Sequence, residues 1–111
     1  MNKRKATEYL DIEGVSPYGR WFNQLNAEAA NKVTTAVYRL ELGHFSNVAP
    51  IGEGVSEYKI DFGPGYRIYF SMDGNELIIL LGGGSKKKQN RDIESAKKYW
   101  RQYKLRKHKE K

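Results

Sequence analysis

The sequence contains no cysteine, only two histidines and no long hydrophobic run. Without cysteine the chain cannot form disulfides, thiolate metal sites or a thiol nucleophile. His44 and His108 belong to no acidic cluster with metal-ligand spacing, so we expect both to be ordinary surface residues. The longest apolar run, residues 77–81, is too short to cross a bilayer. We therefore expect no bound metal, no small-molecule cofactor and no membrane partner.

The chain has enough hydrophobic and aromatic residues for one folded domain. It is 111 residues long, and 39% of them are hydrophobic. No internal repeat and no Pro/Ser-rich linker divides it, so we expect a single domain over residues 1–111. The N-terminus is basic but is not followed by an apolar segment, which predicts that there is no signal peptide.

The positive charge is concentrated at one end of the chain. Residues 86–111 carry 12 basic and 3 acidic side chains, whereas residues 1–85 carry 8 and 10. The net charge of +7 therefore comes from the last quarter, which contains a basic C-terminal helix and tail from about residue 90 to 111. Such an asymmetric field indicates a polyanionic partner.

The first half of the sequence predicts a short strand over residues 7–12 and then two helices. Ser16 and Pro17 are a typical helix start, and apolar residues at helical spacing follow them. A second helix is expected from about residue 27 to 42 and is closed by Gly43. The next residues, around Pro50 and Gly52, are expected to form a loop.

The second half predicts three antiparallel strands and a helix. Residues 56–62 and 66–70 alternate polar and apolar side chains, with a turn at Gly63-Pro64-Gly65 between them. If Phe62 pairs with Tyr66, their apolar faces match. Residues 76–81 are apolar on both faces and predict a central strand. The order β-α-α-β-β-β-α predicts an α+β fold, with helices packed on one face of a mainly antiparallel sheet.

Two glycine-rich segments do not match nucleotide-binding loops. Gly63-Pro64-Gly65 lies in a hairpin and lacks the third glycine of a dinucleotide loop. Gly82-Gly83-Gly84-Ser85-Lys86 follows a strand but has the wrong spacing for a P-loop, so we interpret it as a flexible strand-to-helix connection.

Basic side chains gather on the face of the predicted sheet that is turned away from the apolar core. Lys59 and Arg67 share this face with Tyr69, whose ring is a candidate for base stacking. Lys86, Lys87 and Lys88 lie at the end of the neighbouring strand. The alternative is cross-strand pairing of Lys59 and Arg67 with Glu57 and Asp61, in which Asp61 lies opposite Arg67. The pattern alone does not separate this structural role from a functional one.

Converging cations suit the cleavage of RNA without a metal ion. This reaction needs an activated 2′-oxygen, stabilisation of the charge on the pentacoordinate phosphorus and a proton for the leaving 5′-oxygen. Fixed cations stabilise the phosphorane, and a lysine can carry a proton.

The sequence resembles the RelE/ParE superfamily of bacterial toxin–antitoxin toxins, in particular its HigB-like, phage-associated branch. The segments that carry the resemblance span roughly residues 15–100 and occur in the family's order. They are Trp21-Phe22-Asn23-Gln24-Leu25, Tyr38-Arg39-Leu40-Glu41-Leu42-Gly43, Gly54-Val55-Ser56-Glu57-Tyr58-Lys59-Ile60, Gly65-Tyr66-Arg67-Ile68-Tyr69-Phe70, and Leu80-Leu81-Gly82-Gly83-Gly84-Ser85-Lys86-Lys87-Lys88-Gln89 with Asp92-Ile93 and Ala96.

The resemblance implies a RelE-like fold and a cytoplasmic toxin that a cognate antitoxin, a small helix-turn-helix protein, holds inactive. It also implies a ribosome-dependent mRNA endoribonuclease, with ribosome and mRNA as partners. The matching catalytic positions are Lys59, Arg67 and Lys86, of which Arg67 stabilises the transition state. Lys87, Lys88 and Arg91 then position the RNA backbone.

The chain departs from the family's pattern at several positions. The family usually has Leu-Arg where this chain has Tyr58-Lys59, and no histidine here matches the catalytic histidine of some HigB toxins. Tyr99 and Tyr103 match the C-terminal catalytic tyrosine of RelE by location only. Two alternatives stay open: a ParE-like toxin that binds DNA gyrase without cutting nucleic acid, and a basic RNA-binding module without catalysis.

Overall fold

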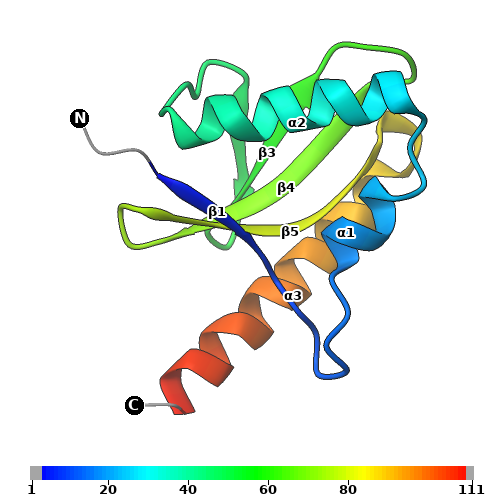
Figure 1. Cartoon of the computed structure of the whole chain (residues 1–111). Helices are drawn as coiled ribbons and strands as arrows, with labels where there is room; N and C mark the ends of the chain where they lie inside the picture. Colours follow the sequence, from blue (N-terminus) through cyan, green and yellow to red (C-terminus); the bar gives the residue numbers. More distant parts are fainter. Residues whose placement is uncertain (1–3, 110–111) are drawn as a thin grey trace.

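The computed structural model describes residues 4–109, which form a five-stranded sheet and three α-helices (Figure 1). In chain order the elements are β1 (Lys5–Glu8), α1 (Pro17–Phe22), α2 (Ala27–Glu41), β2 (Val48–Gly52), β3 (Val55–Ile60), β4 (Tyr66–Asp73), β5 (Leu77–Ser85), a 3₁₀ turn η1 (Lys86–Lys88) and α3 (Gln89–Lys109). The strands lie side by side in the order β1-β5-β4-β3-β2. β1 is parallel to β5, and every other pair is antiparallel. The predicted α+β class and mainly antiparallel sheet are confirmed.

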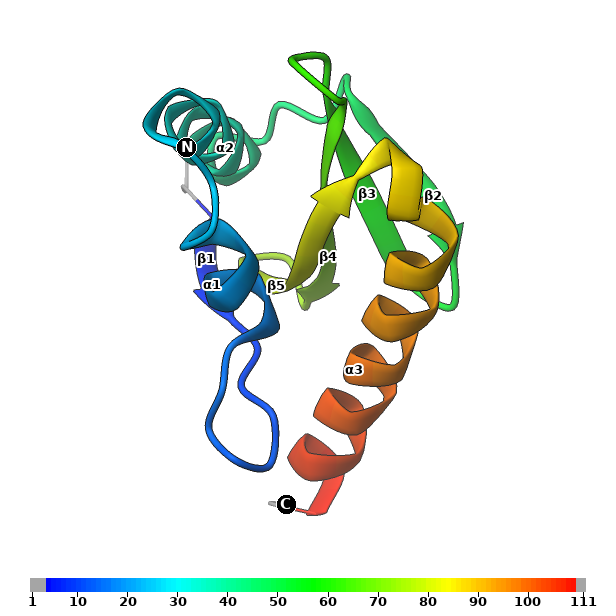
Figure 2. The ribbon, with the colours of Figure 1, turned by 90° about the vertical axis from the view of Figure 1, so that its right-hand side faces the viewer.

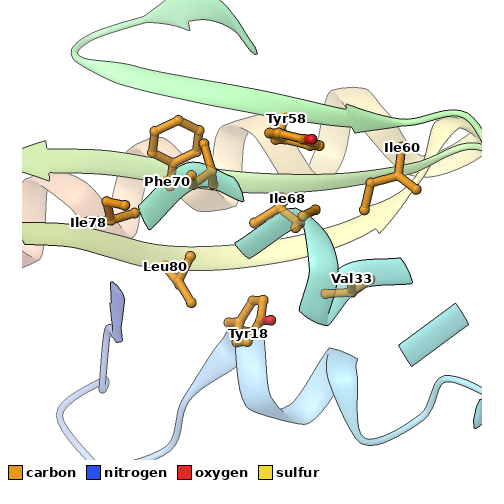
Figure 3. Packing of buried hydrophobic residues seen from close by; sticks show 10 residues of the cluster. Tyr18, Val33, Tyr58, Ile60, Ile68, Phe70, Ile78 and Leu80 are labelled. Carbon is orange, nitrogen blue, oxygen red and sulfur yellow. The ribbon is translucent and has the colours of Figure 1, made fainter. Parts of the chain in front are cut away.

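Helices α1 and α2 pack together on one face of the sheet, as predicted (Figure 2). Ser16 caps α1 by accepting a hydrogen bond from the Gly19 N–H at 2.8 Å, and Pro17 is its first residue. Asn26 caps α2 in the same way, and Gly43 follows its end with φ at +86°. The core under these helices joins the apolar faces of α1, α2, β3, β4 and β5, several of whose side chains are shown in Figure 3.

Helix α3 crosses the opposite face of the sheet (Figure 2). Ala96 and Trp100 of α3 are buried against Leu81 and Ile79, which alternate along β5 with the residues facing α1 and α2. β5 is therefore central and apolar on both faces, as its sequence predicted. The face on which the sequence predicted the basic side chains is therefore not free, because α3 covers a large part of it.

The structure contains one strand more than the sequence predicted. β2 includes Pro50 in a segment that was expected to be a loop. Proline is tolerated there because β2 is an edge strand, with β3 as its single neighbour in the described sheet. β1 begins at Lys5 and ends at Glu8, earlier than the predicted strand over residues 7–12.

The glycine run also differs from the prediction. Gly82, Gly83 and Gly84 are not a flexible connection, since they belong to β5 and pair with Tyr69, Ile68 and Arg67 of β4. No propensity rule favours glycine in a strand. At Gly83 and Gly84 the reason for glycine is tertiary, because Trp21 and Asp92 approach these two positions more closely than a Cβ atom allows.

Candidate nucleic-acid interface

Lys59 of β3 and Arg67 of β4 lie directly opposite each other in the sheet. The turn between the strands is longer than expected, so that Ile60, not Phe62, pairs with Tyr66. A shift of two residues leaves every side chain on its predicted face. Lys59 and Arg67 therefore share a face, as expected, but their environments differ: 57% of the Lys59 side chain is exposed, against 10% for Arg67.

The carboxylate of Glu57 lies between these two cations. Its Oε2 atom is 3.8 Å from Arg67 Nε and 4.0 Å from Lys59 Nζ. Its Oε1 atom accepts a hydrogen bond of 2.9 Å from Gln89 Nε2, at the start of α3. Glu57 is buried, and a buried charge needs such partners. The alternative pairing of Lys59 and Arg67 with Glu57 is therefore present. The expected position of Asp61 opposite Arg67 is wrong, because Lys59 lies opposite Arg67.

The guanidinium of Arg67 keeps unused hydrogen-bonding capacity. Its Nη1 atom donates to the Gly65 carbonyl oxygen at 3.3 Å, whereas its Nε atom is buried without a hydrogen-bond partner. A guanidinium carries five N–H donors in a planar fork that matches a phosphate. Arg67 is thus an oriented cation, bonded to Gly65 and paired with Glu57, whose donors are not all used within the chain.

Lys86 joins this cluster through Gly65. β5 ends at Ser85, and the backbone N–H of Lys86 donates to the Gly65 carbonyl oxygen at 2.8 Å. The same carbonyl accepts from Arg67. Gly65 has φ at +78°, and the Lys86 Cβ and Arg67 Nη1 atoms both lie 3.6 Å from the position that a Cβ on Gly65 would take. The β3–β4 turn therefore brings the three predicted catalytic cations to one end of the sheet.

The predicted RNA-positioning cations continue from this end into α3. Lys87 and Lys88 belong to the η1 turn, Arg91 lies in the first turn of α3, and all three are exposed. Residues 86–91 line a shallow polar depression of about 360 Å³. Lys88 and Arg91 also border a cavity of about 370 Å³ between α1 and α3, with Gly83 and Gly84 among its lining residues. A strip of cations therefore runs from the Arg67 cluster along the beginning of α3.

Two comparisons with known proteins cover most of the chain. Residues 20–104 match the family described as "Phage derived protein Gp49-like (DUF891)". The chain belongs to this Gp49-like family. It is a family of RelE/HigB-like toxins of toxin–antitoxin systems. The chain is also 35% identical over 89 residues to an uncharacterized protein of Haemophilus influenzae (strain ATCC 51907 / DSM 11121 / KW20 / Rd), covering 79% of this chain and 90% of that protein.

In this Gp49-like chain Tyr69 does not present its ring to solvent. The residue is 0% exposed and is packed beneath α3 with Leu81 and Trp100. Its hydroxyl has no hydrogen-bond partner, and burial raises the pKa of the phenol well above its usual value. The proposal that Tyr69 stacks on a base is inconsistent with this burial, which the alternating pattern of β4 did not reveal because α3 is distant in sequence.

A partly buried carboxylate, Asp92, faces the glycine run. Its side chain occupies the space that a Cβ on Gly84 would need. Burial raises the pKa of Asp92, while the nearby Arg91 and Lys88 oppose this change. Asp92 thus places a hydrogen-bond acceptor in the cavity between α1 and α3, beside the cations Lys88 and Arg91. The sequence pattern did not single out Asp92 as a site residue, because the fold and not the spacing brings it against Gly84.

The two tyrosines considered as counterparts of the RelE tyrosine are engaged elsewhere. Tyr99 stacks on Tyr9 with ring centroids 5.2 Å apart, and the Tyr103 hydroxyl donates to Asp73. Within residues 4–109 no group of three histidine or acidic side chains gathers as a metal site requires, and no helix is long and apolar enough to cross a membrane. The chemistry available to the described cluster is therefore that of lysine, arginine and carboxylate groups.

Proposed function

We propose that this Gp49-like toxin is a ribosome-dependent mRNA endoribonuclease that works without a metal ion, in the manner of HigB-like toxins. The observation that supports this function is the gathering of Lys59, Arg67 and Lys86 at one end of the sheet: Lys59 pairs with Arg67 across β3 and β4, and the Gly65 carbonyl accepts from both the Arg67 side chain and the Lys86 backbone. A toxin that acts by binding a protein such as DNA gyrase has no need of three cations directed at one place. Cleavage of a phosphodiester does need them, because charge accumulates on phosphorus in the transition state.

In the proposed reaction the 2′-oxygen of a ribose attacks the adjacent phosphorus. The 2′-hydroxyl loses its proton to a base, the new O–P bond forms, and the bond to the 5′-oxygen breaks. The leaving oxygen takes a proton, which gives a 2′,3′-cyclic phosphate and a 5′-hydroxyl. Arg67 donates to the phosphoryl oxygens, while Lys59 and Lys86 serve as proton carriers or charge stabilisers.

Glu57 is a positioning residue in this scheme. Its carboxylate contacts Arg67 and Lys59 from the buried side of the cluster, and Gln89 fixes the carboxylate in turn. A guanidinium held in this way loses little rotamer freedom when phosphate binds. In this scheme RNA contacts the exposed Lys59 and Lys86 first, and the more deeply buried Arg67 then contacts the phosphate.

Lys87, Lys88 and Arg91 bind the RNA backbone beside the cluster. Each phosphate contact that a lysine makes to a single strand contributes about −0.7 to the slope of log affinity against log salt. Lys87→Met and Lys88→Met are therefore expected to weaken RNA binding at low salt and to reduce this slope by about one contact each. Lys104→Met, on the distal part of α3, is the matched control. Equal slopes in all three variants would contradict this role.

Primer extension on translated mRNA tests the proposed cleavage. The wild type should cut within codons of an mRNA under translation. Lys59→Met and Lys86→Met should reduce cutting about 100-fold or more, as for loss of one transition-state contact. Both side chains are exposed, so the variants should fold, and Lys104→Met should cut normally. Arg67→Lys, checked for folding by thermal denaturation, should also lose activity because it lacks the planar fork.

Two other outcomes would refute the proposal. Growth arrest with intact mRNA and blocked DNA supercoiling would identify a gyrase toxin. RNA binding without cutting or toxicity would identify an RNA-binding module. The low exposure of Arg67 is the specific observation that favours this second alternative, since a buried guanidinium paired with Glu57 also has a structural role.

A further inference from the structure

The loop between β1 and α1 holds an isoleucine in solvent. Ile12 is 94% exposed, the largest fraction among the large hydrophobic residues of the described chain. The loop around it is nevertheless well organised. The Asp11 carboxylate accepts hydrogen bonds of 2.9 Å from the N–H groups of Glu13 and Val15, and two backbone hydrogen bonds close the turn. A loop fixed by four hydrogen bonds therefore displays an apolar side chain that has no role in the core.

A second exposed apolar residue lies across a groove from this loop. Leu105 of α3 is 62% exposed, and Ile12, Leu105 and Tyr99 line a groove of about 450 Å³ between the loop and the helix. Exposed apolar side chains that cluster in this way mark a surface for protein binding more often than a surface for nucleic acid. We call this surface the Ile12–Leu105 groove.

Cations surround the Ile12–Leu105 groove. Lys98, Arg106 and Lys109 line it, and all three are exposed. Among the described lining residues Asp11 supplies the single carboxylate, and backbone N–H groups already bind it. The groove thus matches a segment that has apolar residues on one face and acidic residues beside them. A polyanion such as RNA complements the cations but gains nothing from Ile12 and Leu105.

The groove is remote from the Arg67 cluster. Lys86 precedes α3 and Leu105 lies near its other end, a separation of roughly 28 Å at about 1.5 Å per residue. In Figure 1 the last turns of α3 extend beyond the sheet, away from the β3–β4 turn. A segment confined to the groove would therefore not reach Lys59 and Arg67.

We propose that the Ile12–Leu105 groove binds an amphipathic, acidic segment of the antitoxin. Membership in a toxin–antitoxin family implies such a partner, and the groove's apolar floor and cationic rim select the segment's chemistry. This inference rests on the family and holds whether or not the toxin cuts RNA.

Binding measurements with the purified cognate antitoxin test the proposal. Ile12→Asp and Leu105→Asp each place a negative charge on the apolar floor and should weaken binding about 100-fold, the size expected for a central interface residue. Leu42→Asp is the matched control, because Leu42 is an exposed leucine outside the groove, and it should bind as the wild type does. Lys98→Glu should weaken binding less, and its effect should shrink as salt is added.

Thermal denaturation checks that each variant folds. Binding of a short RNA is measured beside antitoxin binding, as a second ligand. Unchanged RNA affinity in Ile12→Asp, together with lost antitoxin binding, supports the proposal. Wild-type antitoxin affinity in both Ile12→Asp and Leu105→Asp would overturn it, as would absence of binding to the wild type. Loss of RNA affinity in place of antitoxin affinity would also overturn it and would identify the groove as an RNA surface.

Discussion

The glycine run of β5 offers a sharp test of how α1 meets the sheet. A Cβ atom added to Gly83 would lie less than 3.0 Å from three ring atoms of Trp21, whereas a Cβ on Gly82 would meet nothing within 4 Å. Both glycines lie in the same strand, and neither has a positive φ. Gly82→Ala and Gly83→Ala therefore make the same chemical change in the same secondary structure and differ in packing alone.

The expected difference follows from two opposing terms. Alanine in place of a strand glycine raises the free energy of unfolding by roughly 0.5–1 kcal/mol, because it reduces the freedom of the unfolded chain. At Gly82 this gain should appear in full. At Gly83 the added methyl group must displace the Trp21 ring, and overpacking of this kind costs about 1–3 kcal/mol. We expect Gly82→Ala to be slightly more stable than the wild type and Gly83→Ala less stable by about 1–2 kcal/mol.

Urea denaturation followed by circular dichroism measures both effects, with unchanged m-values as evidence that the unfolding stays two-state. A double-mutant cycle with Trp21→Leu isolates the clash. Trp21→Leu alone should destabilise, but in its presence Gly83→Ala should cost much less than before. Equal stability of Gly82→Ala and Gly83→Ala would refute the packing argument. So would strictly additive effects of Gly83→Ala and Trp21→Leu.

Four further changes probe buried polar groups and a helix cap by the same denaturation assay. Tyr69→Phe should leave the free energy of unfolding unchanged or raise it, because the Tyr69 hydroxyl is buried without a hydrogen-bond partner. Tyr9→Phe should lower it by about 1–2 kcal/mol, because the Tyr9 hydroxyl forms hydrogen bonds with Gln102 and Arg106. Burial raises the pKa of Tyr18 to about 12, above its ordinary value of 10. The phenol therefore keeps its proton to higher pH in the folded state than in the unfolded state, so the free energy of unfolding should fall as pH rises from 10 to 12. Tyr18→Phe should reduce that fall. Ser16→Ala should cost about 1 kcal/mol by removing the cap of α1, and an unchanged midpoint would contradict this.

Local signals in the sequence predicted the parts of the fold that short-range physics controls. The cap and proline of α1, the glycine after α2 and the alternation along β3 and β4 each depend on neighbouring residues, and each prediction is confirmed. The face shared by Lys59 and Arg67 was predicted even though the assumed register was wrong, because a two-residue shift preserves side-chain direction.

The remaining features depend on contacts between distant segments, which sequence patterns do not encode. Glu57 meets Gln89 across 32 positions, and Tyr69 is buried because α3 returns over the sheet. The position of α3 also explains part of the glycine run, since Asp92 fills the space where Gly84 lacks a side chain. The proline of β2 suggested a loop, because only the sheet order reveals that this strand is at an edge.

Contacts along α3 determine how far Tyr69 and Arg67 are covered. Gln89, in its first turn, donates to Glu57, while Tyr103 and Lys107 near its end bind Asp73, and Arg106 donates to Tyr9. A helix tied to the sheet along its whole length cannot lift away without losing several of these hydrogen bonds together. Tyr69 beneath it consequently stays covered, and Arg67 stays largely buried between the exposed Lys59 of β3 and the exposed Lys86 that follows β5.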